Sequence, residues 1–288
     1  MLDILTADII LTVIAIVWLI AASVTDIKKR EVADWISYSL IAIALATKIM
    51  VSVLSSDFSY LYYSLIGLGI FFGLAMALYY SRIFGGGDAK LLMALGACFA
   101  VKPVFAKVMS FGFIYNEPFL LTLIINMLFI GAIYGIVFSI INGLRNKKGF
   151  SRTYKENSKK NYKIFYFALA IILFVFALIT KTYNLIILAV IFAVLPYIFT
   201  AVKSSEQLMI KLKSGKDLSE GDWLAKPIKI KNKNLKITAD GLSKEDIKLI
   251  TKSKKKVYIK DGIPFVPAIL VALIISLFVG NILLLLIA

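Results

Sequence analysis

Two aspartates at the edges of separate apolar segments are the side chains of this sequence best suited to acid–base chemistry. Asp26 ends the stretch AASVTD, and Asp88 follows three glycines in FGGGDAK, directly before another apolar run. An ionisable side chain at the edge of a membrane span is costly, so each aspartate is a candidate functional group. Because the chain contains no histidine, any proton transfer falls to Asp, Glu, Lys or Tyr.

The residue types that are missing narrow the chemistry further. Ser-His triads and His-ligated zinc sites need histidine, and a four-cysteine zinc site needs more thiols than Cys98 supplies. We therefore expect neither a metal nor a cofactor. Two neighbouring carboxyl groups can hydrolyse a peptide bond without either, because adjacent like charges resist ionising together. The ionised member takes a proton from water while the protonated member polarises the carbonyl.

The roles within such a pair stay open. Asp88 is expected in the first turn of its helix, where the helix dipole favours charge, and Asp26 in a last turn, where it disfavours charge. This contrast favours Asp88 as the base and Asp26 as the acid, whereas the cations Lys28, Lys29 and Arg30 oppose it. Each aspartate alone is better explained as a helix cap, an ion-pair partner or a water-exposed group.

The three glycines before Asp88 need an explanation of their own. In a helix interior each glycine costs about 1 kcal/mol relative to alanine. At a helix entrance, Gly85, Gly86 and Gly87 allow close backbone approach or leave amides free for a ligand. We predict that they bind an extended peptide substrate main chain to main chain. The alternatives are a hinge and tight helix packing.

The elements that must position these residues are membrane helices. The chain has 288 residues, of which 60% are hydrophobic, and a mean hydropathy of +0.87. Several stretches reach the ~20 apolar residues that span a bilayer, and the first lacks the features of a cleavable signal. We predict an all-α polytopic membrane protein of about eight transmembrane helices, at residues 8–26, 34–54, 60–81, 87–109, 119–143, 163–180, 185–202 and 263–288. The sixth and seventh segments are so close that a re-entrant pair remains an alternative.

The distribution of cations predicts the orientation of these helices. Residues 145–163 carry eight Lys or Arg against one acid, and residues 203–261 carry sixteen Lys against eight acids. With eight spans, both loops lie on the same side as the turns at 28–30 and 82–90. The positive-inside rule makes that side cytoplasmic. Asp26 and Asp88 then both lie at the cytoplasmic boundary of the cell membrane.

The basic loops also bear on partners. Anionic lipid contributes about 1 kcal/mol per surface cation, so membrane lipids are expected partners. We expect no nucleic acid, because no recognisable fold or stacking aromatic pattern accompanies the lysines. Lys48, Lys102 and Lys107 are expected to extend toward the outer interface.

The domain organisation follows from a change in pattern after residue 203. KPIKIKNKNLKI alternates as a pair of strands, Ser243 can cap a short helix with Asp246, and KKVYIKDG returns to a strand pattern. We predict a transmembrane core at 1–203 with an extra helical hairpin near 163–202. A small basic α+β domain at 204–262 faces the cytoplasm, and a last transmembrane helix occupies 263–288.

Three motifs resemble those of known membrane proteases. Gly85-Gly86-Gly87-Asp88 fits the GxGD signature of intramembrane aspartyl proteases. Asp26 with the following IKKREVADW resembles the first-aspartate motif of type IV prepilin peptidases. GIPFVPAILVALIISLF, which follows the small basic domain, resembles the end of archaeal preflagellin peptidases.

This resemblance implies an archaeal aspartic endopeptidase that removes short, positively charged leaders from preflagellins or type IV pilin-like precursors at the cytoplasmic membrane face. It makes Asp26 and Asp88 the catalytic pair, with Gly85 and Gly87 shaping the loop before Asp88. The extra hairpin departs from the compact preflagellin peptidases, so flagellin and pilin both stay possible substrates. The presenilin-like branch expects a tyrosine where this chain has Thr25.

Two other classes of function compete with proteolysis. A transporter or channel could use a buried acid at a glycine-broken helix, although both acids sit at one interface and not near the midplane. A non-catalytic assembly protein could use its cytoplasmic domain to dock a partner. Nothing in the sequence indicates the oligomeric state or the cleavage-site preference.

Overall fold

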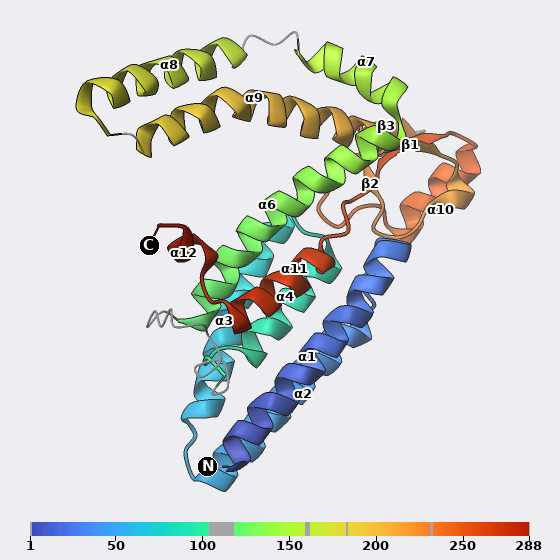
Figure 1. The fold of residues 1–288 in the computed structure, drawn as a ribbon. Helices are drawn as coiled ribbons and strands as arrows, with labels where there is room; N and C mark the ends of the chain where they lie inside the picture. Colours follow the sequence, from blue (N-terminus) through green and yellow to red (C-terminus); the bar gives the residue numbers. More distant parts are fainter. Residues whose placement is uncertain (1, 104–117, 159–161, 183, 231–232, 288) are drawn as a thin grey trace.

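The chain folds into a helical bundle that carries a helical hairpin and a strand-containing segment at one end (Figure 1). The computed structural model describes residues 2–103, 118–158, 162–182, 184–230 and 233–287. Its α-helices are α1 Leu2–Lys29, α2 Asp34–Ser55, α3 Ser59–Tyr80, α4 Gly86–Cys98, α6 Phe119–Arg145, α7 Lys147–Ser158, α8 Tyr162–Thr180, α9 Asn184–Leu208, α10 Lys244–Ser253, α11 Val266–Phe278 and α12 Ile282–Ile287.

The long helices make this a multi-pass membrane protein, as predicted. Within the described residues, six helices are long and apolar enough to cross a bilayer, namely α1, α2, α3, α6, α8 and α9. Helices α4 and α11 have 13 residues each, or about 20 Å, which is less than the ~30 Å hydrocarbon core. Residues 104–109, the end of the predicted fourth segment, lie outside the described residues.

Helix α4 lies at the centre of the bundle. It packs against α2 and α3 and also contacts α1, and most of its side chains are buried. Glycines allow the close approach to α3, because a Cβ at Gly96 would lie 2.5 Å from the Cβ of Phe71. Side chains from α1, α2, α3, α4, α6 and α11 form one continuous apolar core around it. The bundle therefore fixes the position at which α4 begins.

The structure divides the segment 263–288, which the sequence predicts as one helix, into α11 and α12. The break lies at Gly280, whose φ of +92° is a conformation that other residues rarely adopt. Asn126 of α6 stabilises the break from the side. Its Nδ2 donates to Ser276 Oγ at 2.9 Å and to the carbonyl of Gly280 at 2.7 Å, and its Oδ1 accepts from the amide of Ile282.

The predicted extra hairpin is present as α8 and α9, each long enough to span a membrane. The two helices pack on each other, and α9 also contacts α6 and the short basic helix α7, which the sequence patterns did not predict. In Figure 1 the hairpin diverges from the bundle of α1 to α4. Most of its large apolar side chains are exposed, so lipid is their natural surrounding.

Residues 209–262 form the strand-containing segment. β1 (Ile210–Lys213), β5 (Val257–Lys260) and β2 (Trp223–Leu224) make one antiparallel sheet in that order, and β3 (Ile228–Ile230) pairs with β4 (Lys233–Leu235). The predicted strand pair and the last strand are confirmed, as is α10 with its cap. There Ser243 Oγ accepts the amide of Asp246, and the Asp246 carboxylate accepts the amide of Ser243. A separate apolar cluster that includes Leu224, Ile250 and Ile259 lies between these elements.

A buried ion pair joins α1 and α2 within the bundle. Lys48 Nζ lies 3.0 Å from Asp8 Oδ1, and the two side chains are only 7% and 12% exposed. The prediction that Lys48 extends to the outer interface is therefore wrong, since its charge is satisfied inside the bundle. Lys102 is half-buried, and Lys107 lies outside the described residues.

Replacing one partner of this pair should destabilise the bundle. Lys48→Met leaves the Asp8 carboxylate buried without its lysine, and we expect the free energy of unfolding to fall by about 3–5 kcal/mol. Denaturant unfolding in mixed micelles measures this loss. The double variant Lys48→Met/Asp8→Leu removes both charges and should recover most of it. A loss below about 1 kcal/mol in the single variant would show that the ion pair contributes little.

Candidate active site

Asp26 lies in the last turn of α1 with its carboxylate turned into the protein. The side chain is buried, at 5% exposure. Its Oδ2 accepts a hydrogen bond at 3.0 Å from the backbone N–H of Val266, the first residue of α11. Helix α1 ends shortly afterwards, at Lys29, where Arg30 takes a positive φ. The carboxylate therefore bridges the end of one helix and the start of another.

Asp88 lies in the first turn of α4, as the sequence predicts. Its Oδ2 accepts the backbone N–H of Gly85 at 3.2 Å, so the carboxylate closes the start of its own helix. The residue is half-buried. Helices α1 and α4 are in contact, and the carboxylates of Asp26 and Asp88 interact electrostatically. The two aspartates that the sequence singles out thus lie at one end of the bundle, and the charge of Asp26 acts on Asp88.

Neither aspartate has a cation within ion-pair distance in the part of the chain that the structure describes, although the charge of Arg30 acts on Asp26. Lys90, which is close to Asp88 in sequence, lies 2.6 Å from Asp34 instead and also covers the ring of Tyr38. The explanation of Asp88 as an ion-pair partner of Lys90 is therefore excluded.

The three glycines before Asp88 meet different surroundings. A Cβ at Gly87 would lie 2.8 Å from the Cβ of Val32, at the turn before α2, so a side chain there has no room. A Cβ at Gly86 would be 3.7 Å from Tyr79 Cε2, which is ordinary contact. Tight helix packing, one of the two alternatives to substrate binding, therefore accounts for Gly87 but not for Gly85 or Gly86. The half-buried loop leaves space at Gly86.

Residues of α6 form a wall of the site that the sequence patterns did not reveal. Tyr134 interacts electrostatically with Asp26 and Arg30, and its ring stacks on Phe138 at 6.3 Å. Arg30 lies over the Phe138 ring at 5.5 Å and donates from Nη1 to the carbonyl of Gly262 at 2.9 Å. Positions 134 and 138 share one face of α6, but hydropathy does not tell which face of an apolar helix meets α1.

The arrangement is suited to acid–base chemistry on an amide. When the charges of two carboxyl groups interact, the state in which both groups are ionised is disfavoured. One proton is then shared between them over a range of pH. Asp88 accepts the backbone N–H of Gly85, Asp26 accepts that of Val266 with the backbone of Phe265 as a weaker partner, and both carboxylates keep further lone pairs for a water or a substrate. Within the described residues, no cluster of three His, Cys, Asp or Glu could hold a metal ion.

Comparison with known proteins is consistent with this geometry. A family model described as the type IV leader peptidase family matches residues 13–140, which include both aspartates. The preflagellin peptidase of Methanococcus maripaludis is 33% identical over 168 residues, which cover 52% of this chain and 71% of the relative. The preflagellin peptidase of Methanocaldococcus jannaschii is 28% identical over 147 residues, covering 50% of this chain and 62% of that protein, less than two thirds of its length. No solved structure matches the chain.

The packing of the glycine loop leads to a test with a control in the next residue. In Gly87→Ala the added methyl group meets Val32, so the first turn of α4 should open more easily. We expect amides of residues 84–90 to exchange hydrogen about 5- to 100-fold faster, as measured by mass spectrometry. Gly86→Ala has room and should leave the exchange rate unchanged. Equal effects of the two substitutions would contradict this account.

Proposed function

Because this chain belongs to the type IV leader peptidase family, we propose that it is a membrane aspartic endopeptidase of the GxGD type. It removes N-terminal leader peptides from preflagellin or type IV pilin-like precursors. The observation that carries the proposal is the meeting of two carboxylates from separate helices, Asp26 and Asp88, within the matched residues. The two relatives are named preflagellin peptidases, so preflagellin is the first substrate to test.

The proposed reaction uses the shared proton of the pair. The ionised carboxylate accepts a proton from a water molecule, whose oxygen attacks the carbonyl carbon of the scissile bond. The protonated carboxyl group donates to the carbonyl oxygen, where negative charge develops. The carboxyl group that took the proton of the water gives it to the leaving nitrogen, the C–N bond breaks, and the other carboxylate takes a proton from one hydroxyl of the diol intermediate. The result is two peptides and a dyad ready for another cycle.

The glycine loop is the proposed substrate-binding element. Gly85, Gly86 and Gly87 carry no side chains between the backbone and an incoming peptide, and at Gly86 a Cβ would make only ordinary contact with Tyr79. An extended peptide beside this loop could pair with it main chain to main chain and bring its carbonyl to Asp88. The packing of Gly87 on Val32 keeps the loop in place while this happens.

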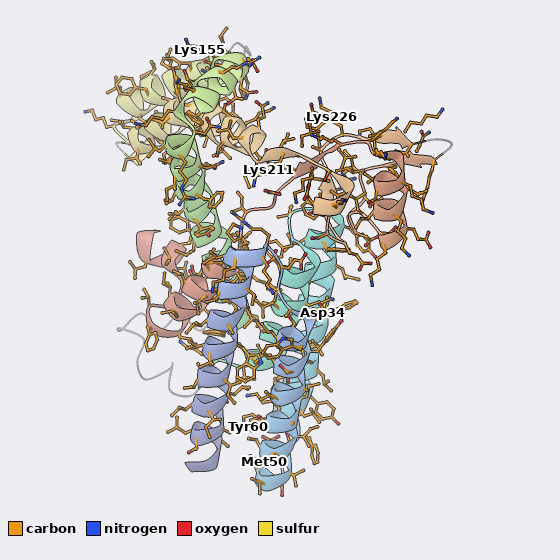
Figure 2. All side chains as sticks on the ribbon, turned by 90° about the vertical axis from the view of Figure 1, so that its right-hand side faces the viewer. Asp34, Met50, Tyr60, Lys155, Lys211 and Lys226 are labelled. Carbon is orange, nitrogen blue, oxygen red and sulfur yellow. The ribbon has the colours of Figure 1, made fainter. Side chains whose placement is uncertain are left out.

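The proposed location of the site is the cytoplasmic face of the membrane. Figure 2 shows Lys155, Lys211 and Lys226 at one end of the molecule and Met50 and Tyr60 at the other. The last turn of α1, which holds Asp26, points toward the basic end and reaches the strand-containing segment (Figure 1). Cytoplasmic loops carry the excess of Lys and Arg. We therefore infer that residues 204–262 form a cytoplasmic domain beside the site.

Loss of either carboxylate should abolish cleavage. In Asp26→Asn or Asp88→Asn the remaining acid has no partner with which to share a proton. We expect the rate of preflagellin cleavage by the full chain in detergent or proteoliposomes to fall about 10²- to 10⁴-fold. Asp34→Asn, a matched change at the exposed partner of Lys90, should retain activity.

Each possible result of this experiment has a defined meaning. Wild-type rates in a folded Asp26→Asn or Asp88→Asn variant would exclude the dyad. If the wild-type protein leaves preflagellin intact but cleaves a pilin-like precursor, the dyad stands and the substrate changes. If it cleaves neither precursor, the proposed function is wrong.

A further inference from the structure

A further inference, which rests on the proposed function, concerns how the two aspartates are held in position relative to each other. We propose that Phe265, in the connector between β5 and α11 (residues 261–265), is a positioning residue. With Phe84 it sets the placement of both carboxylates relative to each other.

The connector is attached to the last turn of α1 at both of its ends. At its start, the carbonyl of Gly262 accepts from Arg30 Nη1 at 2.9 Å. At its end, the N–H of Val266 donates to Asp26 Oδ2 at 3.0 Å. Asp26 and Arg30 are one helical turn apart, and the N–H of Arg30 donates to the carbonyl of Asp26. The connector therefore follows the end of α1 as a unit.

Phe265 fills a space between the residue before the glycine loop and helix α6. Its ring lies 5.0 Å from the ring of Phe84, the residue directly before the glycine loop. It also occupies the place where a side chain of Gly131 would project from α6, since a Cβ there would lie 2.5 Å from Phe265 Cζ. Phe84 is itself buried, at 4% exposure. The ring of Phe265, which is half-buried, is thus in contact with both the residue before the glycine loop and α6.

Each phenylalanine of this aromatic pair directly precedes a residue whose backbone N–H donates to one of the two aspartates. Asp88 accepts the N–H of Gly85, the residue that follows Phe84. Asp26 accepts the N–H of Val266, the residue that follows Phe265. The two rings, tilted by 47° to each other, therefore link the two backbone donors, and the donors hold the two carboxylates. A change in the ring contact should alter the approach of both acids to a substrate.

The strand-containing segment reaches this assembly at a second point. Asp240, in the loop before α10, accepts from the hydroxyl group of Tyr79 at 2.5 Å. Tyr79 lies at the end of α3, and its ring faces Gly86. The segment therefore touches the glycine loop through Tyr79 and Asp26 through the connector, so its placement bears on both halves of the site.

A pair of complementary substitutions tests the role of Phe265 in the full-length protein. Phe265→Leu removes the outer part of the ring, and Gly131→Ala places a methyl group where that part lies. We expect each single variant to cleave preflagellin about 10- to 100-fold more slowly, through a lower kcat at similar KM. The double variant refills the space and should return to within about threefold of the wild type.

The pH profile separates positioning from a loss of folded protein. An N–H that donates to a carboxylate stabilises its ionised form, so a displaced donor should move the acid limb of the cleavage profile to higher pH. The other groups that face Asp26, namely Arg30, Asp88 and Tyr134, are unchanged in these variants. Phe71→Leu, a buried change elsewhere in the same core, should leave the limb in place.

Hydrogen exchange gives a readout that does not depend on cleavage. Phe265→Leu should speed exchange in residues 84–90, although these are far from residue 265 in sequence, whereas Phe71→Leu should not. If exchange, pH profile and kcat of Phe265→Leu all match the wild type, the positioning role is wrong while the proposed function stands. If the wild type cleaves no precursor but the exchange effect is seen, the proposed function fails and the coupling through Phe265 remains.

Discussion

A carboxylate that is shielded from bulk water must be reached by other hydrogen-bond donors. Both aspartates of this site meet that condition in the same way, through a main-chain N–H. Asp26 uses the amide that opens α11, and Asp88 uses the amide that precedes α4. The two N–H donors lie at the starts of α11 and α4, and Asp26 lies at the end of α1. The fold must therefore bring these three helix ends close together. The topology of α1, α4 and α11 follows from that requirement.

Close contacts at small residues make this convergence possible. Between membrane helices, apolar burial supplies little attraction, so packing depends on how closely backbones approach. Gly96 lets α4 approach α3, Gly87 lets its first turn lie against Val32, and Gly131 receives the ring of Phe265. The glycine run before Asp88 therefore serves packing at one position and leaves another open. That division is compatible with a loop that is fixed in place yet accessible to a peptide.

The sequence predicted the six long helices, the strand pair and the places of Asp26 and Asp88 at helix ends, because hydropathy and turn residues act locally. The family was also predicted, since its motifs lie in continuous stretches. The partners of individual side chains were not predictable in this way. Lys48 turns inward to Asp8, and Phe265 meets Gly131, because lipid and protein interior are equally apolar and hydropathy does not distinguish the two faces of a helix. The break at Gly280 depends on Asn126, which is distant in sequence.

Because the donors are backbone N–H groups, these hydrogen bonds place few restrictions on which residue types can occupy the donor positions during evolution. A backbone N–H is present whatever side chain follows it, and only proline lacks one. The residue types at positions 85 and 266 can therefore drift, as far as these two bonds are concerned, without removing support from either acid. Homologues with little residue identity around the site can in this way retain one and the same reactive geometry.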